Sequence, residues 1–183
     1  MQPQLVELTE EFSAATRRLD ALERSLSPEQ WRRRPSPTSW SAIECVQHLN
    51  LTAAATLPRV RGGLEEARAS GGTAPARLRR DFWGWLLWRG LRQPGRYRTK
   101  TTPAFVPDIS RTPADIVAEF RRLQGDHIRY VRQCEGLPVD RTRIVSPFNE
   151  KVHYSVYSAL WILAVHQHRH LWQAEQSARA AAV

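Results

Sequence analysis

The sequence predicts an all-α protein, a four-helix bundle with a long proline-rich crossing loop and a short aromatic insertion. Long segments carry apolar residues at three- and four-residue spacing, which is typical of amphipathic helices. No pair of strand-like segments and no internal repeat interrupts this pattern, and loops of mixed length join the segments. At 183 residues with 42% hydrophobic composition, the chain is expected to form a single domain over residues 1–183.

The first helix is expected over residues 5–26, where seven apolar positions recur at helical spacing. They are Leu5, Leu8, Phe12, Ala15, Leu19, Leu22 and Leu26. The Ser27-Pro28 pair ends this helix, and residues 32–39 form a turn-rich connector.

The second helix is expected to begin at Ser41, because Ser41 followed by Glu44 has the spacing of a capping box. It continues towards Arg68, with Pro58 as a candidate kink. A pair of glycines at positions 62 and 63 weakens its far end.

Three shorter segments follow. Residues 69–76 form a flexible link, and residues 80–91, "RDFWGWLLWRGL", form a short aromatic helix that needs a packing surface. Residues 93–113 contain four prolines and no helical period, which predicts the extended crossing loop. The third helix begins at Thr112-Pro113, with threonine as the cap and proline at the first helical position.

The third helix is expected to end at Gly136 and Pro138. Another loop follows over residues 141–155. The fourth helix covers residues 156–181, where the apolar run "SALWILAV" precedes a cluster of histidines.

The composition is strongly basic, with a net charge of +9. Eight basic residues lie between Arg77 and Lys100, with Asp81 as the only acid among them. A basic stripe with interleaved tryptophans can contact nucleic acid or an anionic membrane surface. We favour the simpler interpretation of a solvated basic surface, and we do not expect nucleic acid as a partner.

Three tryptophans of the same stripe, Trp83, Trp85 and Trp88, are expected to be exposed. Exposed aromatic residues make a homodimer reasonable. The role of the basic aromatic segment 77–100 is otherwise left open by the sequence.

No run of apolar residues reaches the ~18 needed for a membrane span. The N-terminal residues lack a basic head followed by an apolar core, so no secretory signal is predicted. Cys45 and Cys134 are too few to form a disulfide framework. A cytoplasmic location is therefore expected.

The stretch "HQHRH" places three of the six histidines within five positions. On a helix, His166 and His170 lie about 40° apart on one face, whereas His168 lies roughly opposite. Two imidazoles one turn apart can share a metal ion, since imidazole suits zinc, nickel, copper or iron. The alternative is a pair of histidines on a solvated helix face.

A metal centre needs at least one more ligand. The candidates are His48, His127, His153 and Cys45. Helical periodicity places His48 opposite the apolar face of its helix, towards solvent or a polar cleft. His127 is interpreted as a surface residue, and His153 cannot be placed. Cys45 is interpreted as a small buried residue.

Two segments carry a resemblance to a known family. "WSAIECVQHL" over residues 40–49 and "HQHRHLWQ" over residues 166–173 resemble the signature segments of the DinB-like superfamily, also called YfiT-like or damage-inducible proteins. The resemblance implies a four-helix bundle of DinB/YfiT type. It also implies a divalent metal held by His48, His166 and His170, which supplies the missing ligand.

The resemblance further implies an enzyme that activates a thiol or water for transfer to, or hydrolysis of, a small molecule. Zinc or nickel is the expected ion, with a low-molecular-weight thiol as a second cofactor. Glu44 is the only nearby candidate for a catalytic base, although a capping role is favoured. Arg96 and Arg98 are candidate partners for the carboxylates of the thiol.

Two other functions remain open at this point. The first is a bundle that binds metal without catalysis. The second is a basic binding module that uses residues 77–100 against nucleic acid or an anionic surface. The metal, the substrate and the oligomeric state do not follow from the sequence.

Overall fold

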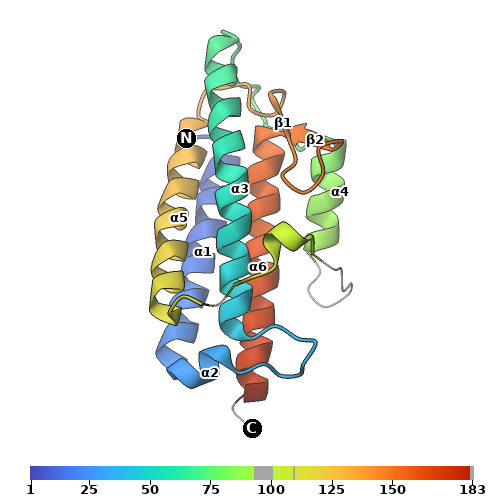
Figure 1. Cartoon of the computed structure of the whole chain (residues 1–183). Helices are drawn as coiled ribbons and strands as arrows, with labels where there is room; N and C mark the ends of the chain where they lie inside the picture. The colour runs from blue at the N-terminus through green and yellow to red at the C-terminus, as the bar shows by residue number, and fades with distance from the viewer. Residues whose placement is uncertain (93–100, 109, 182–183) are drawn as a thin grey trace.

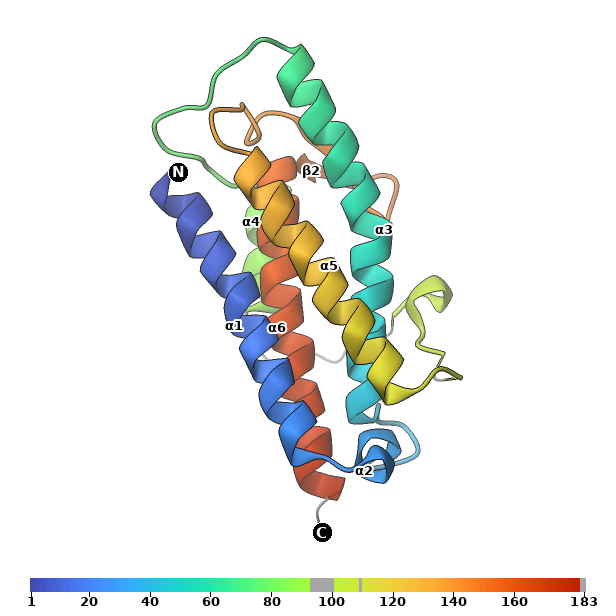
Figure 2. The ribbon, with the colours of Figure 1, turned by 90° about the vertical axis from the view of Figure 1, so that its left-hand side faces the viewer.

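The computed structural model describes residues 1–92, 101–108 and 110–181, and the protein is mostly helical (Figure 1). Four long helices lie side by side. They are α1 (Pro3–Ser25), α3 (Ala42–Ala69), α5 (Pro113–Gln133) and α6 (Val156–Ala181). Helix α3 contacts both α5 and α6, and α1 contacts the same two helices on their other side. The four therefore form a closed ring of neighbours, which Figure 2 shows from a second direction.

The shorter elements surround this ring. They are α2 (Pro28–Arg32), α4 (Phe82–Leu91), the 3-10 turn η1 (Pro103–Phe105), β1 (Arg143–Val145) and β2 (His153–Ser155). Helix α4 is the predicted aromatic insertion, and it packs against α6. Residues 93–113 were predicted to form an extended loop. Residues 93–100 and 109 of this loop lie outside the described residues, and residues 103–105 form the 3-10 turn η1.

Several small elements were not predicted from the sequence, among them a pair of short strands and helix α2. Strands β1 and β2 pair antiparallel with Ile144 opposite Tyr154, so the expectation of no strand pair is wrong. Each strand has three residues, which is too short to show an alternating pattern. Helix α2 begins with a capping box between Ser27 and Gln30, where only the end of the first helix was predicted, and it stops at Arg32, the first residue of the predicted connector.

The helix starts follow the predicted local signals. The Ser41 hydroxyl accepts from the backbone N–H of Glu44, and the Glu44 carboxylate accepts from the backbone N–H of Ser41 at 2.8 Å. Thr112 caps α5, as predicted, and its side chain accepts from the backbone N–H of Asp115. Helix α3 continues through Pro58 and the two glycines, and Gly63 permits its close approach to Val156, because a Cβ there would lie 2.5 Å from the Val156 side chain.

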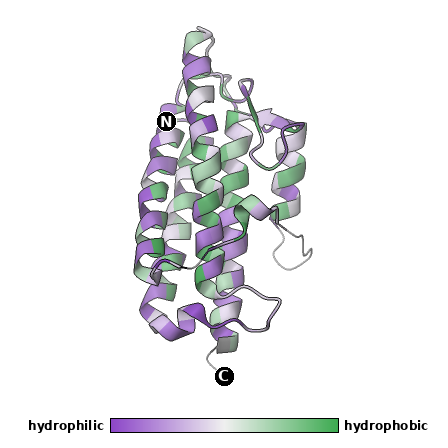
Figure 3. Cartoon of the chain, in the orientation of Figure 1, coloured by the Kyte–Doolittle hydropathy of each residue, from purple (hydrophilic) through white to green (hydrophobic). Residues whose placement is uncertain are grey.

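The apolar core has two parts along the length of the ring. One cluster contains Leu5, Leu8 and Phe12 of α1 with the second half of α3 and the first half of α6. The other contains the second half of α1, the first turns of α3 and α5, and the end of α6. Figure 3 shows the hydrophobic residues concentrated on the first turns of α6.

A layer of buried polar side chains lies where the two clusters meet. The Gln167 amide of α6 donates to the Gln124 side chain of α5 at 2.7 Å, and Gln124 donates to the Phe12 carbonyl at 2.8 Å. His48 of α3 precedes Leu49 of one cluster and Ala53 of the other. This layer positions the candidate site at mid-height of the ring. Within the described part of the chain, no helix is both long enough and apolar enough to cross a membrane.

Candidate metal centre

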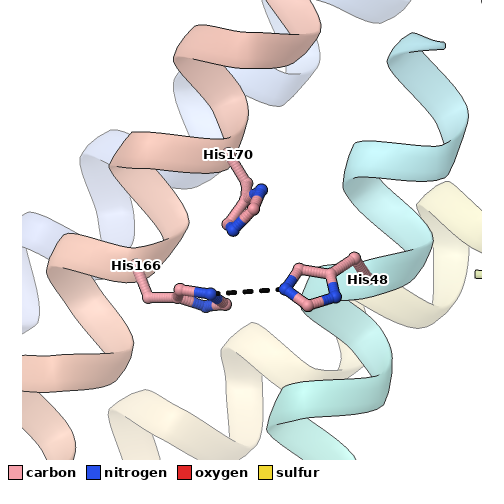
Figure 4. A group of neighbouring side chains, drawn as sticks. All are labelled: His48, His166 and His170. Atoms are coloured by element: carbon pink, nitrogen blue, oxygen red, sulfur yellow. Dashed lines mark hydrogen bonds between the residues drawn. The ribbon is translucent and has the colours of Figure 1, made fainter. Parts of the chain in front are cut away.

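Three imidazoles, from two helices that are far apart in the sequence, lie close together in one group (Figure 4). His48 comes from α3, and His166 and His170 come from successive turns of α6. One nitrogen of each ring lies within 4.8 Å of one nitrogen of each of the others. The Nε2 atoms of His48 and His166 lie 3.4 Å apart.

The placement of His48 corrects the expectation drawn from periodicity. Its side chain is 3% exposed rather than turned to solvent. The first turns of α3 are buried on every side, because α2, α5, α6 and η1 all contact this helix. A helix buried all round has no solvent face, so the apolar period does not tell which side chain faces the interior.

A backbone carbonyl fixes the orientation of the His48 ring. Nδ1 of His48 lies 2.8 Å from the Phe105 carbonyl oxygen of η1. A carbonyl only accepts, so this nitrogen carries the proton and donates. The lone pair of Nε2 then points towards His166 and His170, which is the tautomer required of a metal ligand.

The three histidines are neutral at physiological pH. Burial lowers the pKa of His48, and burial together with the charges of His48 and Arg169 lowers the pKa of His166 to about 3. Burial and the neighbouring His166 and His48 rings lower the pKa of His170 well below its ordinary value. Neutral imidazoles keep the lone pairs that a cation needs.

The arrangement fits a divalent ion with nitrogen ligands. Two nitrogens at about 2.05 Å from a tetrahedral zinc are about 3.3 Å apart, and the His48 and His166 nitrogens are 3.4 Å apart. The burial of the three rings keeps water from competing for their lone pairs, and three neutral imidazoles suit a divalent ion of the zinc or nickel type.

Aromatic side chains surround the three histidines. The Trp40 ring centroid lies 4.9 Å from that of His48 and 6.0 Å from that of His170, which agrees with its predicted packing role. Phe105 packs on Phe148 at 4.5 Å, and Phe148 lies 6.4 Å from His166. Phe148 is 40% exposed, so it stands at the edge of the site.

Sequence reasoning did not identify Phe105 as a contributor. Its contribution comes from a backbone carbonyl, and a backbone group leaves no signature in residue type. The only available signal was Pro103, which starts the 3-10 turn that brings the carbonyl to His48.

Glu44 caps its helix, the role favoured from the sequence. Its carboxylate accepts from the Ser41 backbone and hydroxyl, each at 2.8 Å, and pairs with Arg34. Burial alone would raise the pKa of Glu44, but the hydrogen bonds from Arg34 and Ser41 outweigh it and hold the pKa below its ordinary value. His48 is oriented by Phe105 and not by Glu44.

The remaining candidate ligands lie elsewhere. His168 lies away from the histidine group, as predicted, and its Nε2 lies 2.9 Å from the Glu11 carboxylate of α1. His127 is fully buried and stacks on Phe12 at 4.6 Å, so its interpretation as a surface residue is wrong. His153 is exposed on β2. Cys45 is 1% exposed, and burial raises its pKa to about 12.

The basic aromatic segment divides into two faces. Trp83 and Trp85 of α4 are 45% and 44% exposed, as expected, whereas Trp88 is partly buried against the core. Arg96 and Arg98 lie outside the described residues. The homodimer remains a prediction.

Comparison with known proteins gives one result. Residues 11–174 match the DinB superfamily, a span that includes His48, His166 and His170. No curated protein and no solved structure matches the chain. The match covers most of the sequence and both segments that bring the three imidazoles together, and the chain therefore belongs to the DinB superfamily.

Proposed function

We propose that this protein is a metal-dependent enzyme that uses His48, His166 and His170 to activate a thiol or water for reaction with a small molecule. The observation that carries the proposal is the convergence of three neutral imidazole nitrogens within 4.8 Å of one another. The four long helices then correspond to the four-helix bundle of DinB/YfiT type. Zinc or nickel is the proposed ion, because three imidazole ligands suit either.

When bound, a divalent ion supplies Lewis acidity that lowers the pKa of a thiol or water and provides a nucleophile near neutral pH. The protein supplies the rest. The Phe105 carbonyl holds the His48 proton on Nδ1, so that Nε2 remains a ligand. Three neutral ligands add no negative charge, and this favours the anionic form of the incoming thiol.

The aromatic wall limits the access of water. Trp40 covers His48 and His170, and Phe105 with Phe148 covers the side towards His166. An apolar wall beside a nucleophile favours a substrate with an apolar portion next to its reactive atom. The exposed edge of Phe148 marks the side from which a small substrate enters.

We assign the proton-accepting role to solvent rather than to Glu44, so that the thiol or water that reacts loses its proton to bulk water. A general base works best with a pKa near the working pH, and Glu44 has a lowered pKa and a committed hydrogen-bond network. This assignment leaves Glu44 as a helix cap that holds the start of α3, and hence His48, in place.

A second candidate function is metal binding for stability without catalysis. The location of the histidines between the two apolar clusters favours it, because an ion there would join α3 to α6 at the centre of the fold. The two functions differ in one measurement. A catalytic ion changes turnover, whereas a structural ion changes only the free energy of unfolding.

The first test is elemental analysis of protein purified without chelator or nickel resin. Wild type is expected to carry about one divalent ion per chain, and His48→Ala should carry little. His153→Ala is the matched control, because His153 is exposed and outside the group. Equal metal content in wild type and His48→Ala would contradict the site.

The second test separates the two functions. Metal-loaded and chelator-treated proteins are assayed for consumption of a low-molecular-weight thiol with a chlorinated aromatic electrophile, and for hydrolysis of a 4-nitrophenyl ester. The enzyme proposal expects turnover that is lost with the metal and absent in His170→Ala. A stability change on metal removal, with no turnover in any sample, favours the structural role.

A further inference from the structure

A cavity of about 860 Å³ lies beside α6, away from the histidine group. Residues of α1, α4 and α6 line it, together with the segment that precedes α4. On α6 its wall includes Val165, His168 and Trp172, and none of the three metal-site histidines belongs to it. The volume falls within the ~300–1,000 Å³ typical of small-molecule sites.

The walls of this cavity are strongly basic. Six arginines and two glutamates contribute the charged groups: Arg18, Arg77, Arg79, Arg80, Arg92 and Arg169, with Glu7 and Glu11. A concave surface with this excess of one sign concentrates ligands of the opposite charge. The cavity therefore selects for anions.

Two of the arginines converge on one indole. The guanidinium carbon of Arg80 lies 4.1 Å from the centre of the Trp88 ring, and that of Arg92 lies 5.0 Å from the same centre. Arg80 also lies 5.2 Å from the Trp161 ring. Burial has the largest effect on the pKa of Arg80 and lowers it, the nearby Tyr157 and Glu7 act to raise it, and the positive charge of Arg92 acts to lower it. Arg80 and Arg92 thus hold two positive charges on the same side of the cavity.

Glu7 lines the same cavity and attracts Arg80 from beyond ion-pair distance. Among the described residues, no carboxylate lies within ion-pair distance of Arg80 or Arg92. Nε of Arg80 is buried without a hydrogen-bond partner, and the same is true of the Trp88 indole N–H. Arg80 is half-buried and Arg92 is exposed, so an anion that enters the cavity can reach both guanidinium groups and form charge-assisted hydrogen bonds with them.

The remaining surface is aromatic. Trp85, Trp161 and Trp172 line the cavity together with Tyr157. Indole rings offer large flat contact areas at little cost in conformational entropy. A ligand that fills the cavity therefore needs an apolar, flat body as well as its charged group.

The cavity is preformed because α4 is fixed to α6. The Asp81 carboxylate accepts from the Gly84 backbone at 3.0 Å, from the Ser155 backbone at 2.6 Å and from the Ser158 hydroxyl at 2.8 Å. Gly84 allows the two helices to approach, since a Cβ would lie 2.1 Å from the Ser158 hydroxyl oxygen. A site held in this way loses little freedom when a ligand binds.

We propose that this cavity is a binding site for a small aromatic anion, with its carboxylate or phosphate held by Arg80 and Arg92 and its ring against the tryptophans. The site is separate from the histidine group, and its occupation does not depend on the metal-dependent function. Carboxylates and phosphates share the chemistry that two guanidinium groups recognise, so the test includes one of each.

Isothermal titration calorimetry with metal-free protein tests this site directly. The probes are 2-naphthoate, 2-naphthyl phosphate, the neutral 2-naphthalenemethanol and inorganic phosphate. At least one naphthyl anion is expected to bind about tenfold or more tightly than the neutral alcohol, because charge-assisted hydrogen bonds are strong. Inorganic phosphate is expected to bind more weakly than naphthyl phosphate, since it lacks the aromatic body.

Matched variants locate the binding. Arg80→Gln is expected to weaken binding of the naphthyl anion about tenfold or more. Arg89→Gln is the control, because Arg89 is an exposed arginine of α4 that does not line the cavity. Thermal denaturation checks that both variants are folded, and Arg92→Gln replaces Arg80→Gln if the latter is not.

Three results would overturn the proposal. The first is equal affinity for the anions and the neutral alcohol, or no binding of any probe at millimolar concentration. The second is an equal loss in Arg80→Gln and Arg89→Gln, which would indicate surface charge alone. The third is binding only after zinc is added, which would place the probe at the histidine group. Failure of these tests leaves the metal content of the protein, and hence the proposed function, unaffected.

Discussion

Nδ1 of His48 donates a hydrogen bond of 2.8 Å to the carbonyl oxygen of Phe105, a residue 57 positions further along the chain. This bond connects α3 with η1 and determines which imidazole nitrogen of His48 carries the proton. The Phe105 side chain is 5% exposed and packs against Phe148. The position of the carbonyl therefore depends on how well this side chain is anchored.

Truncation of Phe105 is expected to weaken metal binding although all three ligands remain. In Phe105→Ala the carbonyl loses its anchor, and the His48 ring loses its fixed tautomer. Groups that orient a metal ligand typically change affinity about 10–100-fold. Competition with a chelating dye measures the affinity. Val106→Ala is the control, because Val106 is the next residue and is 52% exposed. Equal affinities in the two variants would mean that Phe105 does not support the site.

Replacement of Glu44 distinguishes its role as a helix cap from a role as a catalytic base. Glu44→Gln keeps the shape of the cap but removes the charge that pairs with Arg34 and accepts from Ser41. Loss of a buried charged hydrogen-bond partner is expected to lower the free energy of unfolding by about 1–3 kcal/mol, with metal content unchanged. Urea denaturation and elemental analysis measure the two quantities. A variant of unchanged stability that has lost turnover would instead identify Glu44 as a catalytic base.

The sequence predicts the four long helices because each carries its own local signals. Apolar spacing marks α1, the Ser41–Glu44 capping box starts α3, and Thr112-Pro113 starts α5. The pair His166 and His170 also follows from spacing, since residues four apart share a helix face. Local signals of this kind predict a helix correctly whatever the helix packs against.

The third ligand did not follow from local signals. His48 lies on a helix that is buried all round, and only the resemblance of its surrounding motif to a family pattern placed it with His166 and His170. His127 is a different case. It lies four residues after buried Leu123 on the apolar stripe of α5, so a signal was present but was outweighed by its charged neighbours Asp126 and Arg129.

His127 makes stability depend on pH. Burial lowers its pKa from 6.5 to about 4, so the folded protein resists a proton that the unfolded chain accepts. The unfolded state binds more protons between these values, and stability therefore falls as the pH falls from about 6.5 to about 4. The contribution of this residue is about 3 kcal/mol.

The matched comparison is His127→Leu, which keeps an apolar side chain beside Phe12 but cannot titrate. Urea denaturation of both proteins is measured at pH 7 and pH 4 in the presence of a chelator. His48, His166 and His170 then contribute equally to the pH dependence of stability in both proteins, so their contribution cancels in the comparison. We expect the wild type to lose about 3 kcal/mol more than the variant between the two pH values. Identical losses would show that the burial of His127 has no effect on proton binding.

Two glycines of α4 should respond in opposite ways to substitution by alanine. A Cβ at Gly84 would lie 2.1 Å from the Ser158 hydroxyl oxygen and 2.2 Å from the Ser158 Cβ, whereas a Cβ at Gly90 meets nothing within 4 Å. Overpacking of this kind costs about 1–3 kcal/mol. Gly84→Ala is therefore expected to lower the thermal midpoint and to displace α4 from α6. Gly90→Ala should leave the midpoint unchanged or raise it, because alanine is the better helix former by about 1 kcal/mol.

The same pair of variants reports on the cavity beside α4. Displacement of α4 moves Trp88 away from the apolar cluster against which it packs. Its indole then becomes more exposed to water, and a red shift of tryptophan fluorescence is expected in Gly84→Ala only. Metal content is expected to be equal in the two variants, since α4 does not supply a ligand. An unshifted spectrum together with an unchanged midpoint in Gly84→Ala would mean that α4 does not pack on α6 as closely as the 2.1 Å separation requires.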